Sequence, residues 1–239
     1  MKIALIGYGK MGKAIEEIAT AKGHTILFKF DISNQAEFTI ENLQKCDVAI
    51  EFTSPHSAVD NLKKCFEAGV PVICGSTGWL TKWDEVISEC EAKNAALVYA
   101  SNYSIGVNLF FELNTYLATL MKKYTNYDVM LEEIHHTEKK DAPSGTAITL
   151  AEQVIKNITS KKSWVNEISN NKEQLAIVSK RIDPAPGTHT IKYYSPIDDI
   201  EITHTAHNRL GFAGGAVLAA EFIANKKGIY NMKQVLGLL

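Results

Sequence analysis

A glycine-rich segment near the start of the chain constrains its fold more than any other feature. Gly7, Gly9 and Gly12 form a G-x-G-x-x-G pattern that follows the apolar run 3–6 and opens a helical stretch. In such a strand–turn–helix unit the first glycine permits the tight turn, the second lets a pyrophosphate approach the backbone, and the third brings the helix close to the strand. The N–H groups and positive dipole end of the helix then bind the phosphates. The segment therefore predicts a dinucleotide site, with a flavodoxin-like turn that binds no dinucleotide as the alternative.

Strand and helix signals alternate through the first hundred residues. Short apolar runs typical of buried strands occur at Ile3–Ile6, Thr25–Phe30, Val48–Phe52, Val70–Cys74 and Ala96–Ala100. This alternation requires right-handed crossovers and a parallel sheet that is buried on both faces. We expect an α/β fold here: a Rossmann-type, doubly wound parallel sheet over residues 1–105, completed by the C-terminal segment 214–239.

The pattern changes after Asn102. Helical stretches are expected at 106–121 and 145–158, and strands at 127–135, 175–181, 189–194 and 200–205. The last three strands have no clear helix between them, which is typical of an antiparallel arrangement. We therefore expect a second α+β domain with a mostly antiparallel sheet over residues 106–213.

Composition and charge exclude several classes of protein. The chain has 25 basic and 27 acidic residues, so there is no overall positive field to attract nucleic acid. No segment approaches the roughly 20 apolar residues of a membrane span, and the start of the chain does not resemble a signal peptide. The four cysteines form no C-x-x-C pair and are expected to be reduced structural thiols. We expect a cytoplasmic protein without nucleic-acid or membrane partners.

Further loops follow strands where a dinucleotide would lie. The segments 52–55 and 75–78 should line the nicotinamide half, because ligands of open α/β sheets bind beyond the carboxyl ends of the strands. Asp31 ends the second strand and is either the ligand of the adenosine ribose or a surface carboxylate. Lys10 and Lys29 could each meet a 2′-phosphate or be solvated surface charges. The choice between NADH and NADPH therefore stays open.

The densest polar segment of the chain runs from Glu133 to Ala147. Its proline and serine at 143–144 are suitable helix-entry residues, so the N–H groups of Gly145 and Thr146 should form an anion site. The segment also contains two imidazoles and two ammonium groups, those of His135, His136, Lys139 and Lys140. A carboxylate substrate fits such a place, and a histidine there can deliver a proton near neutral pH.

The adjacent histidines do not indicate a metal site. Neighbouring residues on a strand face opposite ways, and the chain has no i, i+4 histidine pair on a helix. We therefore expect no metal. For the same reason His135 and His136 need not both reach a substrate, and the residues alone leave open which one does.

The segment 133–146 resembles the signature of the dihydrodipicolinate reductases: two histidines, a lysine, and then Asp-Ala-Pro-Ser-Gly-Thr. The glycine loop, the loop 75–78, the stretch 102–108 and the late segment 204–215 match the family in the same order, so the resemblance covers essentially the whole chain. It implies an NADPH- or NADH-dependent oxidoreductase of diaminopimelate and lysine biosynthesis. Such an enzyme reduces a cyclic dicarboxylate, (hydroxy-)dihydrodipicolinate, to tetrahydrodipicolinate. It also implies a homotetramer assembled through the sheet of the second, substrate-binding domain.

The same resemblance implies roles for individual residues. His135 corresponds to the proton donor, and Lys139 to the group that binds substrate and stabilises developing negative charge. The contacts to substrate carboxylates correspond to His136, Gly145 and Thr146. From the resemblance and from the position of the loops, the cofactor contacts are Gly7, Lys10, Met11, Gly12, Asp31, Phe52, Thr53, Gly75, Ser76, Thr77, Ala100, Ser101, Asn102 and Tyr103.

Two other functions are compatible with a Rossmann unit. Another two-domain NAD(P)-dependent dehydrogenase, of the semialdehyde or amino-acid type, would need a catalytic cysteine or a different basic cluster, and none stands out. A non-catalytic nucleotide-sensing protein would not need both His135 and Lys139, which are intact. Ser54 stands where some family members carry a basic residue, which again leaves the cofactor preference open.

Overall fold

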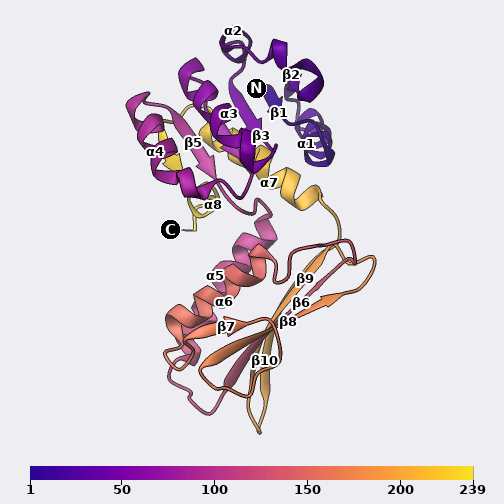
Figure 1. The fold of residues 1–239 in the computed structure, drawn as a ribbon, viewed down its shortest axis with the longest axis vertical. Coiled ribbons are helices and arrows are strands. Elements are labelled where there is room, and N and C mark those ends of the chain that lie inside the picture. The colour runs from indigo at the N-terminus through magenta and orange to yellow at the C-terminus, as the bar shows by residue number, and fades with distance from the viewer. Residues whose placement is uncertain (239) are drawn as a thin grey trace. The chain divides into compact units, whose positions relative to one another are not determined.

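The structure, a computed structural model, describes residues 1–238 and divides into two compact units. The first unit contains Met1–Ile105 together with the segment from Arg209 onward, and the second contains Gly106–Asn208. In Figure 1 the yellow C-terminal helix α7 accordingly lies among the indigo and purple elements of the first unit.

The first unit is built on a six-stranded parallel sheet with the strand order β11-β5-β4-β3-β1-β2. Its strands are β1 (Lys2–Ile6), β2 (Thr25–Phe30), β3 (Val48–Glu51), β4 (Val72–Cys74), β5 (Ala96–Tyr99) and β11 (Gly228–Tyr230). Every residue of β3 and β4 is buried, which explains why these strands, apart from Glu51 at the end of β3, are continuous apolar runs rather than alternating ones.

Helices cover both faces of this sheet. The helical segments are α1 (Lys10–Ala21), η1 (Ile32–Glu37), α2 (Ile40–Leu43), α3 (Pro55–Ala68), η2 (Leu80–Lys82), α4 (Trp83–Ala92), α7 (Leu210–Ile223) and α8 (Met232–Leu236). Residues of α3 and α4 form one core with Ala4 and Ile6 of β1, whereas residues of α1 and α7 form another with Ile3 and Leu5. Alternate residues of one strand thus enter two different cores, and the predicted doubly wound fold is confirmed.

The C-terminal segment extends the sheet. Strand β11 pairs in parallel with β5, and α7 passes so close to the loop after β5 that a Cβ at Gly215 would lie 1.7 Å from the carbonyl oxygen of Tyr103. Only glycine is compatible with that contact. The three-residue strand β11 carries no pattern of its own, and the sequence analysis did not predict it.

The second unit contains a five-stranded sheet with the order β10-β9-β6-β8-β7. Its elements are α5 (Ile105–Met121), β6 (Asp128–His135), α6 (Gly145–Asn157), β7 (Ser163–Val165), β8 (Gln174–Arg181), β9 (Gly187–Tyr194) and β10 (Asp199–Ala206). The pairings β6–β9 and β9–β10 are antiparallel, but β6–β8 and β7–β8 are parallel. The sheet is therefore mixed where we expected it to be mostly antiparallel, because α6 is a crossover connection that returns the chain in the same direction.

Strand β6 determines what lies inside the second unit. Its residues alternate strictly between half-buried and buried positions, and the buried ones are Val129, Leu131, Glu133 and His135. The first two join a core with residues of α5 and α6. The last two carry polar side chains along the same buried face to the carboxyl end of the strand.

Two expectations about the rest of the chain can be compared with the structure. All four cysteines are free and buried, and burial raises the pKa of Cys46 and of Cys90 to about 11. Among the helices of residues 1–238, none combines the length and the apolar character that crossing a membrane requires.

Candidate active site

The glycine loop of the first unit has the shape of a phosphate cradle. Gly7 has a φ of +93°, and a Cβ there would lie 2.1 Å from the carbonyl oxygen of Phe52. A Cβ at Gly12 would lie 2.4 Å from the carbonyl oxygen of Gly7, whereas at Gly9 nothing lies within 4 Å. Gly9 is also the N-cap of α1, and no side chain caps it. The backbone is therefore open to a ligand at the second glycine, and the residues fit a pyrophosphate.

Asp31 lies beside this loop. The backbone N–H of Gly7 donates to the carbonyl oxygen of Phe30 at 2.9 Å, so the residue after Phe30 adjoins the glycine loop. Asp31 is exposed, and its Oδ1 accepts from the N–H of Ile32 at 2.7 Å, which caps η1. Lys29 is paired with Glu16 at 2.6 Å, whereas Lys10 is exposed at the first position of α1.

A buried carboxylate joins the next two loops. Glu51 ends β3 and is fully buried. Its Oε1 accepts from the N–H of Thr53 at 3.1 Å and from the hydroxyl of Ser76 at 3.0 Å, and the hydroxyl of Thr53 also donates to it. The thiol of Cys74 donates to Oε2 at 3.2 Å. Glu51 thus holds the loops after β3 and β4 in a fixed relation, although the sequence analysis did not include it.

The fourth predicted cofactor segment follows β5. Tyr103 is 2% exposed, and its hydroxyl lies 2.9 Å from the carbonyl oxygens of both Cys74 and Val98, so it can donate to either. Its side chain therefore belongs to the core, and only its backbone is left to face a ligand. Ser101 is exposed and Ala100 is half-buried. The segments after β1, β3, β4 and β5 all lie at the carboxyl edge of one parallel sheet, where such sheets bind their ligands.

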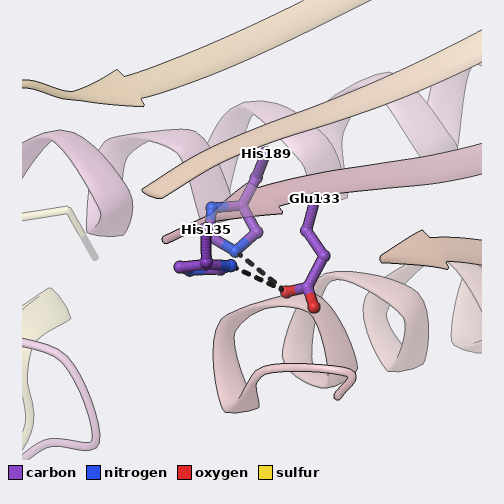
Figure 2. A group of neighbouring side chains, drawn as sticks. All are labelled: Glu133, His135 and His189. Atoms are coloured by element: carbon purple, nitrogen blue, oxygen red, sulfur yellow. Dashed lines mark ion pairs between the residues drawn. The ribbon is translucent and has the colours of Figure 1, made fainter. Parts of the chain in front are cut away.

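The second unit brings Glu133 together with two histidines (Figure 2). Glu133 is fully buried, and its Oε2 lies 3.5 Å from Nδ1 of His135 and 3.6 Å from Nε2 of His189. The sheet explains this grouping. Glu133 and His135 are two residues apart on β6 and share a face, whereas His189 of β9 and Ser179 of β8 are the register partners of Glu133 on either side.

Hydrogen bonds stabilise the charged form of Glu133. The N–H of Ser144 donates to both carboxylate oxygens, at 3.2 and 3.1 Å, and the hydroxyl of Ser179 donates at 2.8 Å. Burial alone would raise the pKa of Glu133, but these bonds and the neighbouring His189 outweigh it and hold the pKa well below its usual range.

Burial acts in the opposite sense on His135. Loss of solvent lowers the pKa of its imidazole to about 4, and the positive charges of Lys139 and Arg181 also lower it, against the opposing attraction of Glu133. At neutral pH the pair therefore consists of an anionic carboxylate and a neutral imidazole.

Arg181 orders the loop that carries Lys139. Its Nε donates to the carbonyl oxygen of Lys139 at 3.2 Å, one Nη donates to that of Asp141 at 2.6 Å, and the other lies 3.5 Å from Glu133. The ammonium group of Lys139 is paired with the carboxylate of Asp141 at 2.8 Å. Because Asp141 is exposed at the surface, a ligand carboxylate could replace it in this pair.

The start of α6 adjoins the same group. Ser144 is its N-cap, and the hydroxyl accepts from the N–H of Ala147 and lies 3.1 Å from Nε2 of His189. Gly145, the first helical residue, is exposed, and a Cβ there would meet nothing within 4 Å. His136 follows β6 and is half-buried, and Thr146 is half-buried in the first turn of the helix.

Glu133, His135 and His189 are close enough to one another to be considered as metal ligands, with ligand atoms all within 4.8 Å. The sequence analysis weighed His135 and His136, with Glu133, Glu138 and Asp141 nearby, for this role but not His189. The surroundings favour hydrogen bonding over metal binding. Glu133 already accepts from Ser144 and Ser179, and the guanidinium of Arg181 at 3.5 Å would repel a cation.

Sequence reasoning missed Glu51, His189 and Arg181. Glu51 had a signal, since it is the one acidic residue in the apolar run 48–52. His189 and Arg181 had none, because each acquires its place only through the pairing of β6 with β9 and β8. The predicted contacts of individual residues with cofactor and substrate stay predictions.

Comparison with known proteins places the chain among reductases. Residues 1–103 match the family model "Dihydrodipicolinate reductase, N-terminus", and residues 106–236 match "Dihydrodipicolinate reductase, C-terminus". A 4-hydroxy-tetrahydrodipicolinate reductase from Christiangramia forsetii is 48% identical over 236 residues, which cover 99% of this chain and 98% of that protein. One from Methanocaldococcus jannaschii is 37% identical over 81% of this chain and 72% of that protein.

Solved structures share the fold. A dipicolinate-bound dihydrodipicolinate reductase from Paenisporosarcina sp. TG-14 has a TM-score of 0.76 at 22% identity and covers 97% of each chain. An amine dehydrogenase from Mycobacterium smegmatis has a TM-score of 0.61 at 11% identity, over 97% of this chain and 95% of that one. At these identities the likeness concerns the fold alone, which reductases and dehydrogenases of different substrates have in common.

Proposed function

This chain belongs to the dihydrodipicolinate reductase family, and from that membership we propose that it reduces (hydroxy-)dihydrodipicolinate to tetrahydrodipicolinate with NADH or NADPH, in diaminopimelate and lysine biosynthesis. The observation that supports this most strongly is that the second unit contains three suitable groups: the buried imidazole of His135, the ammonium group of Lys139 and the N-terminus of α6. The curated relatives are named for the same activity.

The nicotinamide nucleotide supplies the hydride when it is bound. Gly7, Lys10, Met11 and Gly12 would hold its pyrophosphate at the N-terminus of α1, where Gly9 leaves the backbone open. Asp31 accepts from the ribose hydroxyls. Its nicotinamide half would be held by Phe52 and Thr53, by Gly75, Ser76 and Thr77, and by the segment 100–103, because these loops follow strands at the carboxyl edge of the sheet. Asp31 favours the free ribose of NADH, and Lys10 offers a cation to the additional phosphate of NADPH.

The substrate carboxylates bind at the start of α6. The N–H groups of Gly145 and Thr146 face a carboxylate there, and His136 contacts it as well. Lys139 exchanges its pairing with Asp141 for the substrate, and its charge stabilises the negative charge that develops when the ring accepts hydride.

His135 delivers the proton that completes the reduction. The imidazole is neutral in the free protein because burial lowers its pKa to about 4. A substrate with two carboxylates brings negative charge next to it and raises that pKa, so His135 takes up its proton together with the substrate. The imidazole of His135 is therefore protonated only in the complex with substrate.

A dehydrogenase of the semialdehyde type would use a thiolate. All four cysteines are buried, and the pKa of Cys74, beside the cofactor loops, is raised by burial and by Glu51. A thiolate at this position is disfavoured, which supports reduction by hydride and proton transfer.

The enzyme works in the cytoplasm as a homotetramer. The outer face of the second sheet supports the oligomer: Met130 and Ile134 on β6 and Val178 on β8 are half-buried there rather than covered by α5 and α6. Light scattering of the purified protein measures the assembly, and a monomer would contradict it.

A coupled assay tests the function. Dihydrodipicolinate synthase generates the substrate in place from pyruvate and aspartate semialdehyde, and the oxidation of NADH and of NADPH is followed separately. Oxidation that depends on the synthase is the expected result, and the ratio of the two rates gives the cofactor preference. Nucleotide binding without oxidation would instead favour a non-catalytic nucleotide-sensing protein.

A further inference from the structure

Glu133 is an unusual residue for its position. The buried face of β6 begins with Val129 and Leu131, and an apolar side chain at 133 would continue the core. A carboxylate held there as an anion loses its hydration, which costs several kcal/mol unless charges and hydrogen bonds compensate. The compensation observed here involves three strands and a helix, because the partners of Glu133 come from β6, β8, β9 and the N-cap of α6.

The two oxygens of Glu133 have different surroundings. Oε1 accepts from the hydroxyl of Ser179 at 2.8 Å and from the N–H of Ser144 at 3.2 Å. Oε2 shares the N–H of Ser144, at 3.1 Å, and lies 3.5 Å from Nδ1 of His135. That Nδ1 is buried and has no hydrogen-bond partner within residues 1–238, so its 3.5 Å separation from Oε2 is an ion-pair distance. Oε2 is thus an anionic oxygen that lies beside an unpartnered Nδ1 (Figure 2).

The charges around His135 give Glu133 a second effect. The groups that face the imidazole are His189 from β9, Arg181 from β8 and Lys139 from the loop after β6, and each of them disfavours an imidazolium. His204 of β10 lies beyond His189, its register partner. Glu133 is the group that favours the charged ring. Without it, His189, Lys139 and Arg181 would disfavour the imidazolium with no opposing attraction from Glu133.

From this geometry we propose that Glu133 is a positioning residue: it keeps a proton on Nδ1 of His135, leaves Nε2 as the atom that donates to substrate, and ties that imidazole to the N-terminus of α6 through Ser144. The proposal rests on the proposed function, since it assigns His135 the role of proton donor. Its consequence is that proton donor and carboxylate site move as one unit. The backbone N–H of Ser144 donates to Oε2 at 3.1 Å, and the ring of the donor lies 3.5 Å from the same oxygen.

Replacing Glu133 by glutamine tests the role. The Glu133→Gln side chain keeps its size and can still accept from Ser144 and Ser179, but it has no charge. We expect kcat to fall about 100-fold, with the KM for the nucleotide unchanged, because the nucleotide binds to the first unit. Without the carboxylate the imidazolium is less stable, so the alkaline limb of the kcat profile should move to lower pH, and activity relative to the wild type should recover as the pH is lowered.

The neighbouring residue provides a matched control. Glu132 lies on the opposite face of β6, is half-buried, and is paired with Lys180 at 2.6 Å. Glu132→Gln removes the same charge from the same strand without touching His135, and it should leave kcat and its pH profile unchanged. Equal rates and equal profiles for Glu133→Gln and wild type would overturn the proposal while leaving the function intact.

Nitrogen NMR of the histidine ring gives a readout that needs no turnover. In the wild type we expect the His135 proton on Nδ1, and in Glu133→Gln a shift toward the Nε2–H form. An unchanged tautomer would overturn the proposal even if the coupled assay had shown no reductase activity. Should Glu133→Gln fail to fold, Glu133→Asp withdraws the carboxylate by one methylene, and the same loss of the Nδ1–H preference is expected.

Discussion

Each unit of this protein buries a glutamate at the carboxyl end of a central strand, and the two differ in their neighbours. Glu51 is surrounded by neutral donors: a backbone amide, the side-chain amide of Asn61, two hydroxyls and a thiol. Glu133 has two imidazoles and a guanidinium within 3.6 Å in addition to its neutral donors. Glu51 therefore only fixes the positions of its neighbours, whereas Glu133 fixes positions and also places a negative charge beside titratable groups. Burial of a carboxylate by itself does not identify an acid–base site; titratable partners do.

The largest expected difference between the two sites is in turnover. His135→Ala removes the proton donor next to Glu133, and we expect kcat to fall about 1000-fold, within the range that general acids contribute. Nucleotide binding should stay normal, because His135 lies in the second unit. Steady-state kinetics and fluorescence titration of NADH measure the two quantities. Substantial residual turnover would assign the proton to another group.

The Glu51 site should respond in stability and nucleotide binding. Glu51→Ala leaves the N–H of Thr53 and the hydroxyl of Ser76 with fewer partners in a buried place, and we expect a loss of about 3 kcal/mol in the free energy of unfolding. The KM for nucleotide should rise as the two loops loosen. Urea unfolding and kinetics measure these effects. A shifted pH profile of kcat would break the comparison, since it would show that Glu51 also acts on a titrating group.

As the pH falls, the protein should lose stability first through His135 and then, at lower pH, through Glu133. An unfolded histidine binds a proton below about pH 6.5, whereas His135 in the folded protein remains neutral down to about 4. Between these values the unfolded state binds more protons, so stability should decrease as the pH falls, by on the order of 2 kcal/mol. Below about pH 4.5 the lowered pKa of Glu133 adds a further loss. Thermal melts of wild type and His135→Gln across this range check the effect, and parallel curves would contradict it.

A smaller effect is expected in the glycine loop, where the backbone itself serves the ligand. Gly9→Ala adds a methyl group to open space, so stability should hardly change, yet the methyl would stand where a pyrophosphate approaches. We expect about a tenfold rise in the Kd of the nucleotide, about 1.4 kcal/mol. Gly7→Ala is the contrasting variant. Its Cβ would collide with the carbonyl oxygen of Phe52, so it should lose stability as well. Unchanged binding in Gly9→Ala would place the phosphates elsewhere.

Much of the fold could be read from local pattern. The apolar runs of the first unit became strands within one or two residues of their expected bounds, and the helices at 106–121 and 145–158 were found as Ile105–Met121 and Gly145–Asn157. Two short strands, β7 and β11, were not predicted because three residues carry too little pattern. The parallel pairing of β6 with β8 followed from the helix between them, a signal that was present but not used.

The sequence by itself determined the chemistry that is available and where along the chain it stands. The glycine spacing specified a phosphate cradle, and the segment 133–147 specified imidazole, ammonium and helix N-terminus within a few residues. Only the tertiary structure decided which of these groups meet. His189 and Arg181 stand next to Glu133 because strands far apart in the sequence pair in one register, and a register shifted by one residue would turn them to the other face. The tertiary structure also decided the protonation state of His135, because burial lowers the pKa of its imidazole. Burial is a property of the packed sheet and not of the sequence segment.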